Sequence, residues 1–291
     1  MQRERVADDI YIFTSEQYAQ VTASVILTDR GAVLIDTLMF PEETRAIKAY
    51  IEGRLHYPIR YVINTHYHAD HTYGTYLFPD ALVISHALCF DLLNTRGRAG
   101  LEQAQEATSE FADVKLVLPH YVFLNGTLTV NFGNKTLQMW HTPGHSPDSM
   151  VCLAREDRIL FAADTLMPIP HFVDGDYDTF IDTLNRLQAF NRAQSSAVES
   201  IVQGHGEIVL KGEIDDKITG DLEYLRAVKG FAEIARDQAN PEAFLDSISI
   251  EQCGKSRLPL NGSVRDLHRA NLYALYRNLN TKAANTSTIN A

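Results

Sequence analysis

The stretch "NTHYHADHTYG", residues 64–74, constrains the fold of this 291-residue chain more than any other feature. It places three histidines and an aspartate close together, at His66, His68, Asp70 and His71. Imidazole and carboxylate groups are ligands for zinc or iron, and the His-x-His spacing puts two imidazoles on one side of an extended strand end. A lone histidine is usually an ordinary surface or core residue, but this cluster indicates a metal site.

The cluster also predicts ligands elsewhere in the chain. Four ligand-type residues exceed what one tetrahedral ion needs from a single loop, and one loop cannot complete two coordination shells. Further ligands are therefore expected where other buried strands end, because loops at strand ends leave room for chemistry. Three residues fit this description: His145 in "HTPGHSPDS", Asp164 in "LFAADTL" and His205 in "VQGHG".

The order of strand and helix patterns predicts the architecture. Apolar strand patterns occur at residues 9–15, 21–37, 59–65, 81–86, 126–146, 149–165 and 200–206, and helical spacing occurs at 41–55 and 177–190. Two similar strand-rich halves with helices between them suggest a pseudo-symmetric sandwich of sheets covered by helices. From Asp215 onward the pattern is helical without strand signals. We expect a catalytic domain at residues 1–212 and a C-terminal helical extension at 213–291.

Composition and charge exclude several classes of partner and site. The net charge is −11, and no run of basic residues is interleaved with aromatics, so nucleic acid is a poor partner. The apolar runs are shorter than the roughly 20 residues of a membrane span, and the first residues lack the apolar segment of a secretory signal. Cys89, Cys152 and Cys253 are far apart and lack CxxC spacing, so neither a disulfide framework nor a thiolate zinc site is expected. We expect a cytoplasmic protein that binds a small molecule.

In this order along the chain, the seven ligand-type residues resemble the metallo-β-lactamase-fold hydrolase superfamily, over roughly residues 9–210. The resemblance implies an α+β fold, the αββα sandwich, and two metal ions. It implies that the first ion is held by His66, His68 and His145. It implies that the second ion is held by Asp70, His71 and His205. Asp164 is implied to bridge the two.

The resemblance and the ligand chemistry predict a dinuclear zinc hydrolase of an ester, thioester or lactone, with iron or manganese as alternative metals. A side activity towards β-lactams or phosphotriesters is compatible with this expectation. Two such ions can activate a shared water, and Asp70 is the candidate catalytic residue because it could hold that water and accept its proton. Two alternatives stay open: a mononuclear iron enzyme of the persulfide dioxygenase type, and a metal-binding relative without activity.

Some residues near the motifs are candidates for supporting roles. Five could orient the imidazoles: Thr65, Thr142, Ser146, Asp148 and Thr165. Two could line the mouth of the pocket, His86 and His171, and two could contact substrate, Tyr67 and Tyr73. The apolar spacing of the C-terminal helices is expected to form core, with a homodimer contact or a pocket wall as the alternatives.

Overall fold

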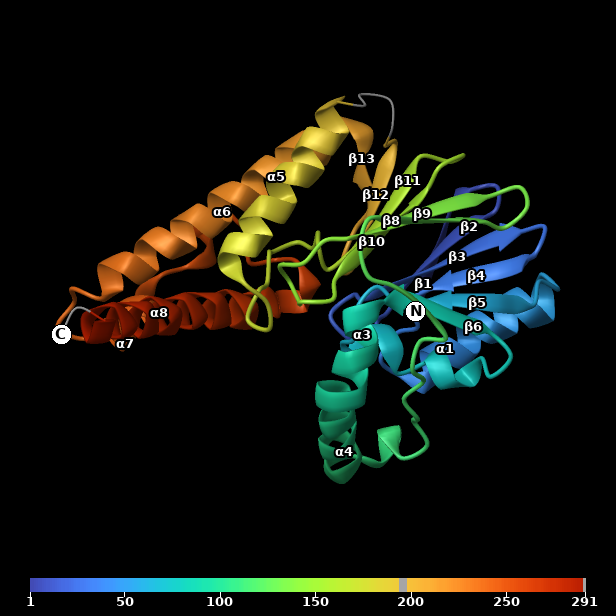
Figure 1. Cartoon of the computed structure of the whole chain (residues 1–291), viewed down its shortest axis with the longest axis horizontal. Helices are drawn as coiled ribbons and strands as arrows, with labels where there is room; N and C mark the ends of the chain where they lie inside the picture. The colour runs from blue at the N-terminus through green and yellow to red at the C-terminus, as the bar shows by residue number, and fades with distance from the viewer. Residues whose placement is uncertain (194–197, 290–291) are drawn as a thin grey trace.

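The computed structural model describes residues 1–193 and 198–289. Two β-sheets lie face to face with helices on their outer sides (Figure 1). The first sheet has seven strands in chain order: β1 (Gln2–Ala7), β2 (Ile10–Thr14), β3 (Thr22–Thr28), β4 (Gly31–Ile35), β5 (Ile59–Ile63), β6 (Leu82–His86) and β7 (Tyr121–Phe123). The second has six strands, in the order β13 (Val209–Leu210), β12 (Ser200–Gln203), β11 (Ile159–Ala163), β10 (Met150–Ala154), β9 (Thr136–His141) and β8 (Thr127–Asn131). The predicted α+β sandwich is confirmed.

The core between the sheets follows from side-chain alternation along the strands. In β2, Ile10 and Ile12 point into the cluster between the sheets, whereas Tyr11 and Phe13 point to the outer side. Met139 and Phe161 of the second sheet pack into the same inner cluster. The central strands are thus buried on both faces, which explains why their sequences read as nearly continuous apolar runs.

Helices cover the outer face of the first sheet. The main one is α1 (Pro41–Lys48), which continues as a π-helix at Ala49–Arg54. The predicted helix at 41–55 is thus present, but its hydrogen bonding widens after Lys48. Ile47 and Ile51 remain on the face that packs on the sheet. The other short helices before the second sheet are α2 (Ala69–Thr72), α3 (Ala87–Leu92), α4 (Arg98–Ala107), and single turns or π-turns at Thr75–Leu77, Leu93–Gly97 and Ser109–Phe111.

Two strands of the first sheet were not predicted from the sequence, and neither was the two-residue β13 of the second sheet. β1 reads "QRERVA", and its side chains are mostly exposed because it lies at the edge of the first sheet. β7 is only three residues long and forms the opposite edge. Neither strand has the apolar pattern of a buried strand, so periodicity gives no signal for it.

The C-terminal part is helical, as predicted. It contains α6 (Ile214–Ala235), α7 (Pro241–Ser247), α8 (Val264–Ile289) and short turns at Lys211–Glu213, Ile250–Cys253 and Leu260–Gly262. Together with α5 (Tyr177–Ala193), α6 and α8 pack on the outer face of the second sheet in one apolar cluster, and Figure 1 shows the three helices extending away from the sheets. Because this cluster is continuous, the domain boundary at 212 stays a prediction. Within the described ranges, no helix is long and apolar enough to cross a membrane.

Candidate metal centre

The seven ligand-type residues meet at one end of the two sheets. His66 and His68 follow β5, and Asp70 and His71 lie on the short helix α2 that comes next. From the second sheet, His145 follows β9, Asp164 follows β11 and His205 follows β12. Strand ends separated widely in sequence therefore supply one cluster. Among the described residues they form two groups, each with its ligand atoms within 4.8 Å of one another.

The first group is built around three imidazoles. Nδ1 of His68 lies 3.1 Å from Nε2 of His66 and 3.0 Å from Nε2 of His145. A tetrahedral zinc ion with ordinary Zn–N bonds would hold such nitrogens about 3.3 Å apart. The observed convergence fits a metal ion, because three ring nitrogens facing one point cannot all be satisfied by hydrogen bonds to one another.

The second group contains two imidazoles and a carboxylate. Asp70 Oδ2 lies 3.3 Å from His205 Nε2 and 3.7 Å from His71 Nε2. The carboxylate of Asp164 lies between this group and the first, with Oδ2 3.2 Å from His145 Nε2 and 3.5 Å from His205 Nε2. Its Oδ1 lies 3.2 Å from His71 Nε2. This is the position that a bridging ligand would take.

Burial and charge also fit a cation at this point. His71 Nε2 and Asp164 Oδ1 are buried without any hydrogen-bond partner, a costly state that a bound cation would relieve. Burial lowers the pKa of His145 to about 3 and keeps this ring neutral. Burial also opposes a charge on His205, but the carboxylates of Asp164 and Asp70 outweigh it and raise its pKa to about 10. In the metal-free protein, His205 is therefore protonated at neutral pH, and its proton supplies positive charge at the centre.

Each imidazole is fixed through the nitrogen that faces away from the centre. The contacts are His66 Nδ1 to Thr65 Oγ1 at 3.1 Å, His68 Nε2 to Asp174 Oδ2 at 3.1 Å, His71 Nδ1 to Asp36 Oδ2 at 2.9 Å, His145 Nδ1 to the His171 carbonyl at 2.7 Å, and His205 Nδ1 to the Ala19 carbonyl at 2.8 Å. Such acceptors hold the proton on the outer nitrogen and leave the lone pair of the inner one free for a metal.

An unusual backbone conformation places Asp36 and Asp164 at the centre. Asp36 follows β4 directly with a φ of 57°, and Ala163, next to Asp164, has a φ of 44°. Both lie in the left-handed region that side chains rarely adopt, which is common where a functional site is held by its surroundings. Gly204 is also required, because a Cβ at this position would collide with Asp164 Oδ1. The ends of β4, β11 and β12 are thus shaped for the cluster.

Sequence reasoning found some of the supporting residues and missed others. Thr65 contacts His66 as expected, whereas the other candidates pair with one another: Thr142 with Thr165 at 2.9 Å and Ser146 with Asp148 at 2.7 Å. The missed residues are Asp36, Asp174 and the carbonyl of Ala19. Only Asp36 had a sequence signal, since it ends an apolar strand as Asp164 does.

A cavity of about 500 Å³ opens above the two groups. It is lined by Gln17, Tyr18, Ala19, His68, Ala69, Asp70, His145, Asp164, Met167, His171, His205, Leu260, Ser263 and Leu267. The last three residues come from the C-terminal extension, which therefore forms a wall of the pocket as well as core.

Of the residues predicted to line the pocket or contact substrate, one lies at the cavity and three do not. His171 lines the cavity, whereas His86 does not and instead stacks on His141 with ring centroids 4.0 Å apart. Tyr67 donates a hydrogen bond to Asp174 at 2.5 Å. Tyr73 is buried in a small apolar cluster. Neither tyrosine lines the cavity.

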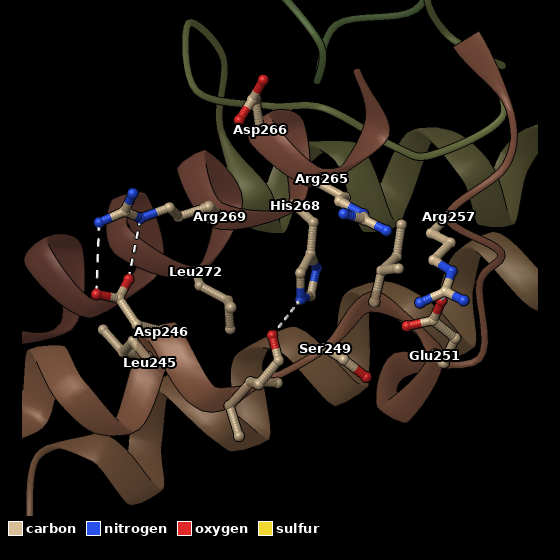
Figure 2. Close-up of a pocket in the computed structure, with 12 residues that line it drawn as sticks. Leu245, Asp246, Ser249, Glu251, Arg257, Arg265, Asp266, His268, Arg269 and Leu272 are labelled. Atoms are coloured by element: carbon tan, nitrogen blue, oxygen red, sulfur yellow. Dashed lines mark hydrogen bonds and ion pairs between the residues drawn. The ribbon is translucent and has the colours of Figure 1, made fainter. Parts of the chain in front are cut away.

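A second cavity of about 470 Å³ lies among the C-terminal helices (Figure 2). Its charged lining consists of Arg257, Arg265, Arg269, Asp246, Glu251 and Asp266. The lining holds three arginines and three carboxylates; Arg269 is paired with Asp246 at 3.0 Å and Arg257 with Glu251 at 3.6 Å. The formal charges of these arginines and carboxylates therefore balance.

Comparison with known proteins agrees with this geometry. The chain is 28% identical to the lactamase-like protein aptB of Emericella nidulans, over 56% of this chain and 46% of the relative. It is 29% identical to the acyl-coenzyme A thioesterase MBLAC2 of Bos taurus, over 49% of this chain and 54% of the relative. The chain thus spans about half the length of these relatives. The solved structure of the stereoselective inverting sec-alkylsulfatase Pisa1 from Pseudomonas sp. superposes with a TM-score of 0.73 at 16% identity, over 95% of this chain and 50% of that one.

The superposition on Pisa1 covers nearly the whole chain, which shows that the sandwich and the helices together form a known fold. The model of the Metallo-beta-lactamase superfamily matches residues 18–229, which include both ligand groups. The chain therefore belongs to the metallo-β-lactamase superfamily.

Proposed function

We propose that this protein is a metal-dependent hydrolase that holds two zinc ions and cleaves an ester, thioester or lactone. The observation that carries the proposal is the pair of adjacent ligand groups with the carboxylate of Asp164 between them. The likeness to a protein named as an acyl-coenzyme A thioesterase supports an acyl substrate.

In this proposal each ligand group holds one ion. His66, His68 and His145 would hold one ion. Asp70, His71 and His205 would hold the other, and Asp164 would contact both. Two bound ions would activate a water molecule and polarise the carbonyl oxygen of the substrate.

Asp70 is the residue of this chain best placed to handle the proton of the attacking water. It lines the cavity, and its side chain is 15% exposed. Burial disfavours its charge, but His71 and His205 outweigh this effect and lower its pKa to about 2. The ionised carboxylate can hold a water molecule by accepting a hydrogen bond, and can receive its proton as the reaction proceeds.

The walls of the cavity favour an apolar acyl group. Met167, Leu260 and Leu267 line it, and among the described lining residues none is lysine or arginine. A substrate part with several phosphates would find no fixed positive side chain there. The acyl part is therefore placed in the cavity, and a larger leaving group would extend outward.

A sulfate ester is the second candidate, because the superposition on a sec-alkylsulfatase covers 95% of the chain, including the C-terminal helices that line the cavity. The absence of arginine and lysine from the described lining ranks this candidate below carboxylic esters. A secondary alkyl sulfate belongs in the substrate panel for this reason.

Elemental analysis and an anaerobic substrate panel test the proposal. Protein purified without added metal should contain about two metal ions per chain, mainly zinc, and should hydrolyse at least one of a para-nitrophenyl ester, an acyl thioester and a lactone without oxygen. One iron per chain with strict oxygen consumption would establish the dioxygenase alternative. Two metal ions per chain without hydrolysis of any compound in the panel would favour the alternative of a metal-binding relative without activity.

We also propose a cytoplasmic location, a small molecule as the partner and a homodimer as the assembly. The net charge of −11 supports a partner other than nucleic acid. Light scattering of the full chain measures the assembly directly.

A further inference from the structure

His171 lies beside the first ligand group and lines the cavity. Its ring centroid is 6.1 Å from that of His145, and its backbone carbonyl accepts the hydrogen bond from His145 Nδ1 at 2.7 Å. A group bound by the His171 side chain would therefore sit next to the reacting centre.

The hydrogen bonds of Asn271 determine which nitrogen of His171 carries its proton. Asn271 lies on α8 and is fully buried. Its Nδ2 lies 2.7 Å from the carbonyl oxygen of Pro170, and a carbonyl can only accept, so this atom is the amide NH₂ group. Its Oδ1 must then be the atom 3.1 Å from His171 Nδ1. Because Oδ1 can only accept, the proton of His171 lies on Nδ1.

A chain of buried hydrogen bonds holds Asn271 in this orientation. His268 Nε2 lies 3.2 Å from the Ile248 carbonyl, shown as a dashed line in Figure 2, so His268 donates through Nε2 and accepts through Nδ1. Tyr224 donates its hydroxyl proton to that Nδ1 at 3.0 Å and accepts from Asn271 Nδ2 at 3.1 Å. The donor and the acceptor of every hydrogen bond in this series are then fixed. Rotation of the Asn271 amide by half a turn would break its hydrogen bonds to Pro170, Tyr224 and His171.

The tautomer leaves a lone pair on Nε2 of His171. This nitrogen makes no hydrogen bond within residues 1–193 and 198–289, and it is not enclosed by protein. Apart from the ligand-type residues, the other polar side chains of the described wall are Gln17, Tyr18 and Ser263, and each can either donate or accept. Outside the two ligand groups, His171 Nε2 is therefore the one polar side-chain atom of the described wall whose acceptor character is fixed by its surroundings.

We propose that His171 determines substrate specificity by accepting a hydrogen bond, through Nε2, from an O–H or N–H group of the substrate close to the scissile bond. The inference rests on the proposed function and names the substrate class more closely: an ester, thioester or lactone whose acyl part carries a hydroxyl or an amide N–H. It also gives the C-terminal extension a role, since α8 sets the tautomer.

Three para-nitrophenyl esters test the specificity: the butyrate, the β-hydroxybutyrate and the β-methoxybutyrate. The methoxy compound keeps the oxygen but loses the donor. Assays at about pH 8 keep an ordinary imidazole neutral. The zinc-loaded wild-type protein should prefer the hydroxy over the methoxy ester about tenfold in kcat/KM, the scale of one hydrogen bond. A wild-type ratio near unity would overturn the inference.

Two variants of His171 form a matched pair. His171→Asn keeps an amide N–H at the place of Nδ1, where it can still donate to Asn271, but removes Nε2. His171→Gln places an amide oxygen near the position of Nε2. The preference should vanish in His171→Asn and return in part in His171→Gln. An unchanged preference in His171→Asn would reject the role of Nε2, whatever the absolute rates of the variants.

Nitrogen NMR of the histidine-labelled full chain gives a readout that does not depend on turnover. The His171 signal should show the proton on Nδ1, and Asn271→Leu should give a mixture of tautomers. A proton on Nε2 in the wild-type protein would overturn the inference even in an active enzyme. If no ester is cleaved, the proposed function fails. The role of His171 is then tested by ligand binding. Its Nε2 signal should shift when β-hydroxybutyrate is added and should not shift with β-methoxybutyrate. Equal shifts would reject the inference.

Discussion

Asp36 Oδ2 lies 2.9 Å from Nδ1 of His71, on the side of the ring that faces away from the metal centre. The same carboxylate accepts hydrogen bonds from the backbone N–H of Thr65 at 2.9 Å and from its hydroxyl at 2.7 Å. Thr65 in turn contacts His66 Nδ1 at 3.1 Å. One buried carboxylate therefore orients a ligand of each group.

Replacing Asp36 with asparagine should weaken metal binding while leaving the fold in place. The amide is similar in size, but it is a weaker acceptor for the His71 proton and loses the charge that favours it. We expect zinc affinity to fall about 10- to 100-fold, chiefly at the group of His71. Competition with a chelator measures the change. Asp9→Asn is a matched control, because Asp9 pairs with Lys135 away from the centre; an equal loss in both variants would contradict this role.

Asp174 should have a similar but smaller effect on the first group. Its Oδ2 lies 3.1 Å from His68 Nε2, and Arg96 donates to its Oδ1 at 2.7 Å. The Asp174 side chain is 30% exposed, so solvent screens its charge more than that of Asp36. For Asp174→Asn we expect zinc to dissociate about tenfold faster from the first group. Arg96→Gln should lie between this variant and wild type, and a slower release in Asp174→Asn would refute the assignment.

The sequence identified the ligand-type residues that the fold brings together, but not most of the acceptors behind their imidazoles. His66, His68, Asp70 and His71 are visible because they share one loop, and the other three ligand-type residues end apolar strands. The acceptors behind the imidazoles have no local pattern, because Asp174 is 106 residues from His68 and Ala19 is 186 residues from His205. Side-chain pairs of this kind depend on how the sheets pack, which periodicity does not describe.

For the C-terminal helices, too, the sequence predicted the local structure but not the packing. Their apolar spacing predicted helices, and α6 and α8 confirm it. The contribution of Leu260 and Leu267 to the cavity, however, depends on where α8 and the turn before it pack against the second sheet. Helical periodicity predicts that a face is buried, but it does not predict what that face is buried against.

The metal-free protein should lose stability as the pH rises, because of His205. The folded protein raises the pKa of this residue from 6.5 to about 10. Its protonation therefore stabilises the fold fully below about pH 6.5, and this contribution is lost as the pH rises towards 10. Urea unfolding of chelator-treated protein at about pH 7 and about pH 9 should show a larger loss in wild type than in His205→Asn.

Another titrating group acts in the same pH range with the opposite sign. Burial lowers the pKa of Lys217 to about 8, so above this pH the folded state releases a proton that the unfolded chain still holds, and stability rises. Lys217 is present in both proteins, and its effect cancels in the comparison. Equal pH dependence of wild type and His205→Asn would show that Asp164 and Asp70 do not stabilise the His205 charge.

The two aspartates of the centre should respond differently to substitution, because only Asp164 contacts both groups. Its Oδ2 lies 3.2 Å from His145 Nε2, and its Oδ1 lies 3.2 Å from His71 Nε2. Asp164→Ala removes a negative charge from between two cation positions, so metal content and activity should fall together. Asp70→Asn keeps the size and one oxygen, and should leave the first group filled while kcat falls about 100-fold, the scale of general acid–base effects.

Metal content and kcat of both variants, each dialysed against the same zinc buffer, separate these roles. If the charge between the groups matters, Asp164→Asn should lose metal nearly as Asp164→Ala does, because both remove the carboxylate while only the second also opens a cavity. Retention of two zinc ions and near-normal kcat in Asp164→Ala would contradict the bridging position. It would also remove the main ground for a dinuclear centre, since no other carboxylate of the described residues belongs to the first group.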